Sequence, residues 1–354
     1  MYNDAGLTIG TYLVNDDSDC YVVAEIGHNH QGSVETCKEL FLSAMNAGAN
    51  AVKLQKRDNE SLFSKEAYNK PYDNPNSYGR TYGEHREFLE FNRHQYLELQ
   101  KYASELGLDF FATAFDIPSA DFLEELDVPA YKFASGDLKS IRLLQHVAKF
   151  GKPMIMSTGG ASLEDIERAY DAVMPTNSQL CIMQCTGGYP PEWHELNLRV
   201  IDTLRNKFPD IVIGFSSHDS GIAMAIAGYM LGARIIEKHF TLNRAMKGTD
   251  HAFSLEPGGM TKMIRDLRRL RLALGDGEKI AYKSEDAPIT KMGKSLVAKN
   301  NLPIGHVVRD DDIAMKSPGG GLPPYEWNAL IGMVVTQPLQ LDDVFSLDKL
   351  ALRK

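Results

Sequence analysis

Residues 211–218 (IVIGFSSH) and residues 234–240 (RIIEKHF) decide the fold of this chain. Each is a short run of apolar and β-branched residues, of the kind found in buried strands, and each leads to a histidine. One helical segment, 221–231, lies between His218 and His239. Two parallel strands joined by a crossover helix bring both imidazoles to the same end of a sheet, where one divalent metal can bind them. Either histidine alone is explained as well by a hydrogen-bonded residue at a strand end, but the matched pair favours the metal.

The same alternation of strand and helix repeats along most of the chain. The runs are short and apolar throughout, which indicates a parallel sheet buried on both faces. An open doubly wound sheet is the rival to a closed (β/α)8 TIM barrel. We prefer the barrel because polar residues fall at strand ends all along the chain, and a barrel gathers them at one mouth. The expected strands are 21–26, 51–55, 109–115, 130–135, 153–157, 180–185, 211–215 and 234–239.

The two ends of the chain do not follow the strand–helix alternation of the central part. Residues 1–20 are expected to form an N-terminal hairpin that plugs one end of the barrel, and 21–277 form the barrel itself. A polar linker, 278–293, then leads to a small C-terminal domain, 294–354, with little core of its own. Within the barrel, segment 56–91 is too turn-rich for a regular element and too aromatic for a disordered linker, so we expect a long loop that serves a site.

Composition limits the classes of protein to consider. A net charge of −9 argues against nucleic acid or an anionic membrane surface as the main partner, and no apolar run is long enough to span a bilayer. The four cysteines, in 354 residues, lack the spacing of a zinc site or a disulfide framework. We therefore expect reduced thiols and a cytoplasmic protein.

Several side chains expected at the mouth have chemistry suited to an anionic metabolite. Two cations and several neutral hydroxyl groups suit a phosphate; they are Lys53, Lys132, Thr113, Ser135, Ser157 and Ser216. Glu25 and Glu237 lie beside apolar strand sequence, where they are candidates for acid–base catalysis or for salt bridges to the lysines; both interpretations stay open. Asp250 follows in a loop over the same mouth, where it can accept hydrogen bonds from a polyol or simply cap a turn.

His28 and His30 suggest a second kind of site. Two histidines after the first strand, together with His218 and His239, form the ligand set of a metal-dependent amidohydrolase. Against this, His28 and His30 follow Gly27 in a loop, where no strand alternation fixes their direction. A non-catalytic barrel that binds a sugar phosphate is the third alternative.

A set of motifs is spread over nearly the whole chain: Ala24-Glu25-Ile26-Gly27, Val52-Lys53, Ala130-Tyr131-Lys132, Ser157-Thr158-Gly159, Gly214-Phe215-Ser216, Glu237-Lys238-His239-Phe240-Thr241 and Asp250. Together these motifs resemble the N-acetylneuraminate (sialic acid) synthase family, which includes legionaminic and pseudaminic acid synthases and a spore-coat polysaccharide relative.

The resemblance implies a TIM barrel followed by an antifreeze-like (SAF) domain, and a domain-swapped homodimer. It also implies roles for the residues at the mouth. His218 and His239 match the ligands of a divalent ion, Mn²⁺ or Mg²⁺, and Glu25 and Glu237 match acid–base positions. The remaining matched residues bind substrates: phosphoenolpyruvate at Lys53, Thr113, Lys132, Ser135, Ser157 and Ser216, and the sugar at Gln55, Tyr189 and Asp250, of which Asp250 is also a candidate for catalysis.

The implied reaction is the condensation of phosphoenolpyruvate with the open-chain aldehyde of a 2-acetamido sugar such as N-acetylmannosamine. The products are inorganic phosphate and a nonulosonic acid, a 3-deoxy-2-keto acid of the sialic acid type. In this reaction a metal acts as a Lewis acid on the aldehyde, and Glu25 is expected to move the proton of the attacking water.

The chain departs from the family pattern at three positions. Gly187 stands where the family commonly has Asn, and Ser217 stands where it commonly has an Asp before the first metal-ligating histidine. Ser317 stands where the small domain usually presents an Arg that reaches the acyl-amino end of the sugar. These differences predict a changed acceptor contact and, at Ser217, a weaker metal site.

Overall fold

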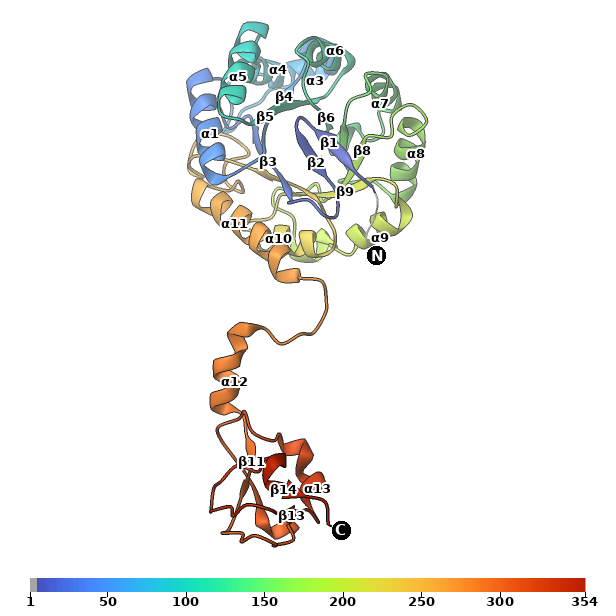
Figure 1. The fold of residues 1–354 in the computed structure, drawn as a ribbon. Helices are drawn as coiled ribbons and strands as arrows, with labels where there is room; N and C mark the ends of the chain where they lie inside the picture. The colour runs from blue at the N-terminus through green and yellow to red at the C-terminus, as the bar shows by residue number, and fades with distance from the viewer. Residues whose placement is uncertain (1–4, 354) are drawn as a thin grey trace. The chain divides into compact units, whose positions relative to one another are not determined.

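Eight parallel strands close into a barrel in the first of the two units of the chain (Figure 1). The computed structural model describes residues 5–353, and the first unit ends at Gly275. Around the barrel the strands follow one another in chain order, and the last pairs with the first. They are β3 (Tyr21–Gly27), β4 (Ala51–Lys56), β5 (Asp109–Ala114), β6 (Tyr131–Phe133), β7 (Met154–Ser157), β8 (Leu180–Cys185), β9 (Val212–Ser217) and β10 (Ile235–His239).

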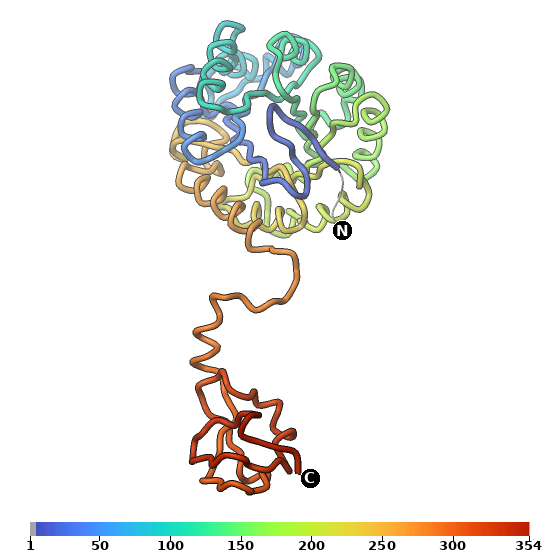
Figure 2. The backbone as a smooth tube through the Cα atoms, in the orientation of Figure 1, coloured from blue at the N-terminus to red at the C-terminus, as the bar shows by residue number. Residues whose placement is uncertain are grey.

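Helices surround the strands, as the backbone trace shows (Figure 2). This arrangement buries the strands on both faces, which explains why they read as continuous apolar runs in the sequence. The predicted fold class, a (β/α)8 barrel with an N-terminal hairpin and a C-terminal SAF domain, is confirmed. The main helices are α1 (Val34–Ala47), α5 (Arg93–Glu105), α6 (Ile117–Glu125), α7 (Ile141–Ala148), α8 (Leu163–Val173), α9 (Val200–Lys207), α10 (Ala223–Met230) and α11 (Pro257–Leu274).

Local sequence signals set where α1 begins and ends. Ser33 caps its N-terminus, because the side chain accepts a hydrogen bond from the backbone N–H of Thr36. At the other end Gly48 adopts φ 91°, a left-handed conformation that ends helices and that glycine adopts without strain. The chain then enters β4 directly, which places Lys53 at a fixed height in the barrel.

The N-terminal hairpin lies at the end of the barrel where the strands begin. It consists of β1 (Leu7–Ile9) and β2 (Tyr12–Val14), paired antiparallel. Tyr12 packs edge-on against Tyr21, the first residue of β3, and a β-carbon on Gly10 would clash with the carboxylate of Asp109 at the start of β5. The opposite end, where the strands finish, is left for a site. Of the predicted hairpin, residues 1–4 lie outside the described part of the chain.

Segment 56–91 is more regular than the sequence suggested. The prediction of a loop without regular elements is wrong, because three short helices occur there: α2 (Asn59–Leu62), α3 (Lys65–Asn69) and α4 (Tyr82–Leu89). Thr81 caps α4 by accepting from the backbone N–H of Glu84. Aromatic rings pack between the helices, for example Tyr72 and Phe63 against Tyr82. The segment is thus an ordered layer over one side of the barrel mouth.

The second unit, from Asp276 onward, has short elements and a core of its own. Its core contains Leu296, Ile313, Leu330 and Phe345, so the predicted small domain, 294–354, has more of a core than we expected from its length. The predicted linker also holds a helix, α12. The elements are α12 (Asp286–Met292), α13 (Trp327–Leu330), β11 (Ser295–Ala298), β12 (Ile313–Lys316), β13 (Val334–Val335) and β14 (Leu350–Ala351).

The described chain also contains short turns of 3-10 helix. None of the helices between residues 5 and 353 has the length and apolar composition of a bilayer span. The 3-10 turns are η1 (Ser135–Asp137), η2 (Trp193–Leu196), η3 (Lys283–Glu285), η4 (Asp310–Asp312), η5 (Pro324–Glu326) and η6 (Leu347–Lys349).

Candidate active site

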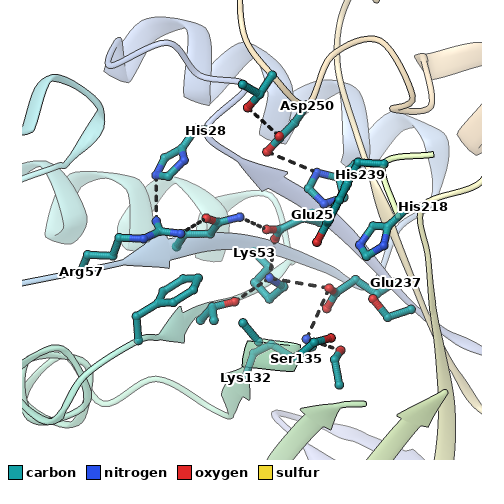
Figure 3. A pocket seen from close by; sticks show the side chains of 18 of the residues that line it. Glu25, His28, Lys53, Arg57, Lys132, Ser135, His218, Glu237, His239 and Asp250 are labelled. Carbon is teal, nitrogen blue, oxygen red and sulfur yellow. Dashed lines mark hydrogen bonds and ion pairs between the residues drawn. The ribbon is translucent and has the colours of Figure 1, made fainter. Parts of the chain in front are cut away.

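A cavity of about 490 Å³ opens where the barrel strands end. This volume is typical of a site for a small metabolite. Every residue to which the family resemblance gave a metal, substrate or acid–base role lines this one cavity; Figure 3 labels several of them. They are Glu25, Lys53, Gln55, Thr113, Lys132, Ser135, Ser157, Tyr189, Ser216, His218, Glu237, His239 and Asp250.

Strand register explains why these residues meet. In the parallel ladder His239 of β10 lies beside Glu25 of β3, and Glu25 lies beside Lys53 of β4. Neighbours in register point to the same face of a sheet, and that face is the barrel interior. The register shifts between Glu25 and Gly27, a bulge of the kind that often re-aims a side chain next to an active site.

Four buried charged side chains form the bottom of the cavity, which we call the floor: Glu25, Lys53, Lys132 and Glu237. The Nζ of Lys53 lies 2.5 Å from Glu25 Oε2 and 3.7 Å from Glu237 Oε1. The Nζ of Lys132 lies 3.6 Å from the same oxygen of Glu237. Two cations and two carboxylates thus compensate one another away from water, without which burial of any one of them would be costly.

Hydroxyl groups extend the floor toward the strand ends. Lys53 donates to Thr113 Oγ1 at 2.8 Å, and Lys132 donates to Ser157 Oγ at 2.7 Å. Ser135 Oγ accepts from the backbone N–H of Gly159 at 2.9 Å. Fixed ammonium groups with neutral donors around them are the chemistry that binds a phosphate or a carboxylate.

The pKa values of the two floor carboxylates shift in opposite directions. Burial raises the pKa of Glu25, with the negative charge of Glu237 adding to the effect and Lys53 opposing it. Burial acts against ionisation of Glu237 as well, but Lys132 and Lys53 outweigh it, and the pKa of Glu237 is lowered. A pair of carboxylates whose pKa values are pushed apart is the usual arrangement for one proton carrier and one fixed negative charge.

His218 and His239 lie together on the other side of the cavity. Their ring centroids are 5.5 Å apart, and the ring of Tyr189 lies 4.2 Å from that of His218. His218 Nδ1 donates to the carbonyl of Thr186 at 2.9 Å, which leaves Nε2 with a free lone pair. His239 Nδ1 is buried without a hydrogen-bond partner among the described residues, and the nearest carboxylate oxygen, Oδ2 of Asp250, is 3.8 Å away.

This donor set fits a divalent metal held by two imidazoles. One ring has a fixed tautomer and the other has a buried nitrogen that lacks a partner. Within residues 5–353 no group of three or more His, Cys, Asp or Glu side chains is arranged to hold an ion. A metal here would therefore take its remaining ligands from water and substrate, which is typical of a catalytic rather than a structural site.

His28 and His30 do not join the other two histidines. Stacked on Phe91 with ring centroids 4.2 Å apart, His30 uses Nδ1 to accept from the backbone N–H of Gly32. His28 lies between two guanidinium groups, 3.1 Å from Arg57 Nη1 and 3.1 Å from Arg86 Nη1. Cations on both ring nitrogens leave no position for a metal ion, so the four-histidine site of the hydrolase alternative is not formed.

Arg57, Arg86 and His28 line the same cavity, and we call these three residues the rim. Figure 3 shows Arg57 and His28 on the side away from the histidine pair. Sequence reasoning missed the two arginines. Arg57 follows β4 and Arg86 belongs to α4, inside the segment expected to be an irregular loop. The signal that could have found Arg86 is Thr81 three residues before Glu84, which is a typical helix start.

Cys185 is a further pocket residue that the sequence did not single out. All four cysteines are free, in agreement with the expected reduced thiols, but Cys185 lines the cavity and its Sγ lies 3.5 Å from Ser135 Oγ. Burial opposes its ionisation, yet the contacts with His218 and Ser135 lower its pKa. Tyr72 and Tyr82 also line the cavity from segment 56–91.

The structure gives a physical context to two of the three departures from the family pattern. A β-carbon at Gly187 would meet nothing within 4 Å, so this position adds open space beside the cavity. Ser217 donates to Asp219, the carboxylate after His218, and Asp219 pairs with Lys238 at 3.1 Å. His218 is thus oriented by the Thr186 carbonyl, and its missing carboxylate is not replaced. Ser317 lies in the second unit.

Taken together, the fold and the cavity define a TIM-barrel enzyme whose cavity has buried lysines and carboxylates at its floor and a pair of histidines beside them. Comparison with known proteins gives the family. The model of the NeuB family matches residues 40–279, and the model of the SAF domain matches residues 293–351. The chain belongs to the NeuB family, as the sequence motifs predicted.

Named relatives and solved structures agree with this assignment. The chain is 40% identical over 331 residues to N-acetylneuraminate-9-phosphate synthase of Homo sapiens, covering 93% of this chain and 92% of that protein. It is 32% identical to N,N'-diacetyllegionaminic acid synthase of Campylobacter jejuni, covering 91% and 98%. The crystal structure of N-acetylneuraminic acid synthetase from Leptospira borgpetersenii superposes with a TM-score of 0.72 at 30% identity, covering 81% and 96%.

Proposed function

We propose that this protein is a nonulosonic acid synthase, which condenses phosphoenolpyruvate with the open-chain aldehyde of a 2-acetamido sugar. The observation that carries the proposal is the composition of the cavity: paired lysines and carboxylates at the floor face two histidines across one space. A doubly anionic substrate and an aldehyde need these two environments side by side. Neither the hydrolase alternative nor the non-catalytic alternative accounts for both.

The reaction forms one carbon–carbon bond and breaks one bond to phosphate. C3 of phosphoenolpyruvate attacks the aldehyde carbon, and the aldehyde oxygen takes a proton and becomes a hydroxyl. Water adds to C2, which has lost electron density, and the tetrahedral product expels inorganic phosphate to leave a 2-keto group. The sum is sugar, phosphoenolpyruvate and water going to 3-deoxy-2-keto acid and phosphate.

The floor residues would serve this reaction in distinct ways. Lys53 and Lys132, with Thr113, Ser135, Ser157 and Ser216 around them, would hold the phosphate and carboxylate of phosphoenolpyruvate. Glu237, whose pKa is lowered, stays ionised and stabilises positive charge at C2. Glu25, whose pKa is raised, takes the proton of the attacking water. Gln55, Tyr189 and Asp250 would contact the sugar.

His218 and His239 would hold a divalent metal ion, Mn²⁺ or Mg²⁺. When bound, the ion supplies Lewis-acid polarisation of the aldehyde oxygen. The protein's part is to orient the two rings: the Thr186 carbonyl fixes His218, and Tyr189 packs on its face. Asp250, near His239 Nδ1, holds its carboxylate toward the same space and accepts from Thr249 Oγ1 at 2.8 Å.

The identity of the acceptor and the assembly are finer parts of the proposal. The human relative is named for a phosphorylated product and the Campylobacter relative for an unphosphorylated one. The family resemblance also predicts a homodimer in which the small domains are exchanged. Light scattering on the purified protein tests the dimer, for which a monomer mass at micromolar concentration is the contradicting result.

Phosphate release tests the function directly. Purified protein is incubated with Mn²⁺, phosphoenolpyruvate and one sugar at a time, namely N-acetylmannosamine, its 6-phosphate, a diacetamido-trideoxyhexose and plain hexoses. We expect release of inorganic phosphate that depends on an acetamido sugar and disappears when a chelator is added. Release that needs no sugar, or none with any sugar, contradicts the proposal.

A further inference from the structure

Arg57 and Arg86 are two pocket arginines without a carboxylate partner. In residues 5–353 no ion pair joins either guanidinium to an Asp or Glu; their hydrogen bonds go to His28, to the Gln55 side-chain carbonyl at 2.7 Å and to the Tyr82 hydroxyl at 2.8 Å. Two half-buried arginines elsewhere in this barrel do pair with a carboxylate, because Arg205 and Arg234 both contact Asp16. Among the described residues, the rim therefore carries two positive charges that no carboxylate contacts directly.

The contacts of Glu90 explain why Arg57 has no carboxylate partner. Its Oε2 pairs with Lys56 Nζ at 2.9 Å, and its Oε1 accepts from the backbone N–H of Arg57 at 3.2 Å. Neither oxygen reaches the guanidinium of Arg57. Glu90 and Asp250 lie near enough to influence the pKa of Arg57, which burial lowers to about 10, but neither is hydrogen-bonded to its guanidinium, and Arg57 lines the cavity.

His28 cannot satisfy both arginines. Burial and the two flanking cations hold the pKa of His28 well below its usual value, so the ring is neutral. A neutral imidazole carries one proton and accepts at one nitrogen only. One guanidinium therefore faces an N–H rather than a lone pair. In addition, Arg86 Nε is buried with no partner among the described residues. Donors left over in a cavity wall are arranged for a ligand that only accepts.

Arg57 is held rigidly for such a ligand. Its guanidinium lies over the ring of Phe115 at 3.7 Å from the centroid, and the side chain is 7% exposed. Stacking and the hydrogen bond to Gln55 fix the plane of the fork, so little rotamer freedom remains to be lost on binding. Gln55 in turn donates to Glu25 Oε1 at 2.8 Å, which ties the rim to the floor.

We propose that Arg57, Arg86 and His28 form a second anion subsite, which binds a phosphate ester at the far end of the acceptor sugar. The inference rests on the proposed function, because it assigns the two anionic groups of the reactants to two places in one cavity. Arg57 and His28 of the rim lie across the cavity from His218 and His239 (Figure 3). An open-chain hexose with its aldehyde at the histidines thus directs its last carbon toward the rim.

Steady-state kinetics on two acceptors test the subsite. N-acetylmannosamine 6-phosphate and N-acetylmannosamine are compared as substrates of the full chain with Mn²⁺ and phosphoenolpyruvate. We expect kcat/KM for the 6-phosphate to exceed that for the free sugar by about 10²-fold or more, because charge-assisted, bidentate hydrogen bonds form only with the phosphate. Arg57→Met should remove most of that ratio, through KM of the phosphorylated sugar, with KM for phosphoenolpyruvate unchanged.

Three further variants show whether the effect of Arg57→Met is specific to the rim. Arg86→Met should reproduce the effect of Arg57→Met, and Arg57→Lys should restore part of it, because an ammonium keeps the charge without the fork. Arg80→Met is the control, since that side chain is 91% exposed and pairs with Glu84 outside the cavity. Calorimetric binding of the two sugars to the Mn²⁺-loaded protein provides a readout that does not need turnover.

The outcomes separate the two claims. Equal kcat/KM for both acceptors, or an equal loss with both in Arg57→Met, overturns the rim subsite and leaves the synthase intact. A raised KM for phosphoenolpyruvate in Arg57→Met also overturns it, since it would assign Arg57 to the other substrate. Absence of phosphate release with every sugar of the panel contradicts the synthase, and tighter calorimetric binding of the 6-phosphate, lost in Arg57→Met, would still support the subsite.

Discussion

The floor and the rim of the cavity are both charged, but only the floor is balanced. At the floor Lys53 pairs with Glu25 at 2.5 Å, and Lys132 lies 3.6 Å from Glu237. The rim has Arg57 and Arg86 with no carboxylate between them. A balanced set can be preorganised for chemistry because its charges are stable without a ligand. An unbalanced set is completed by what it binds, so we assign catalysis to the floor and selection of the acceptor to the rim.

The largest loss of turnover is expected when either His218 or His239 is replaced. His218→Ala or His239→Ala removes one of the two proposed metal ligands, so metal-dependent turnover should fall by at least about 10³-fold. Metal content after dialysis against Mn²⁺, measured by atomic emission, should fall with it. His94→Ala, on the exposed surface of α5, is the control. Retained metal and turnover in both variants would contradict the two-histidine site.

Stability should distinguish the floor from the rim. Lys53→Met leaves Glu25 and Glu237 buried without their shared cation, and removal of one partner from such a set costs about 3–5 kcal/mol in free energy of unfolding. Arg57→Met removes a buried charge that no carboxylate contacts and that burial disfavours, so its free energy of unfolding should fall by far less than in Lys53→Met, or rise. Urea unfolding followed by circular dichroism measures both. Similar losses in the two variants would remove the contrast between floor and rim.

Glu25→Gln should affect rate more than binding. The amide keeps the shape and the hydrogen bond to Gln55 but cannot take a proton, so turnover should fall by about 10²-fold or more while KM for phosphoenolpyruvate stays near its wild-type value. Initial rates of phosphate release give both constants. Unchanged turnover would take Glu25 out of the mechanism.

The smallest effect tests the link between floor and rim. Gly27 has φ 53°, and a β-carbon there would lie 3.1 Å from Gln55 Nε2 and 3.2 Å from Glu25 Oε1. Gly27→Ala should cost about 1–2 kcal/mol of stability through the backbone alone, and should also lower activity. Gly107→Ala, at φ 70° with open space around it, carries the same backbone strain. Equal activity in the two variants would show that the contact with Gln55 is unimportant.

Residues on strands could be predicted from the sequence, whereas residues of the rim could not. Apolar runs with a polar residue at the end place Lys53, Lys132 and His239 in a barrel mouth without any structure, because strand alternation and closure leave them one place to point. Arg57 and Arg86 lie 29 positions apart in a segment without periodicity. Their meeting depends on the packing of α4 over the mouth, which no local pattern encodes.

The pairing of the buried charges also could not be predicted from the sequence. Whether Glu25 and Glu237 act as acid–base groups or as salt-bridge partners stayed open, and the structure shows that both pair with lysines while their pKa values move apart. That outcome depends on burial and on distances of a few ångströms. The same holds for His28, whose sequence position suggested a ligand and whose neighbours turn out to be two cations.

One labelling experiment tests most directly whether the floor releases the phosphate of phosphoenolpyruvate while the rim binds the phosphate of the sugar. N-acetylmannosamine 6-phosphate with ¹⁸O in its phosphate is incubated with unlabelled phosphoenolpyruvate, Mn²⁺ and the protein, and the products are weighed by mass spectrometry. The account predicts unlabelled inorganic phosphate and a nonulosonic acid that retains the labelled phosphate, because the floor releases one group and the rim keeps the other. Labelled inorganic phosphate, or a product without the label, would contradict it.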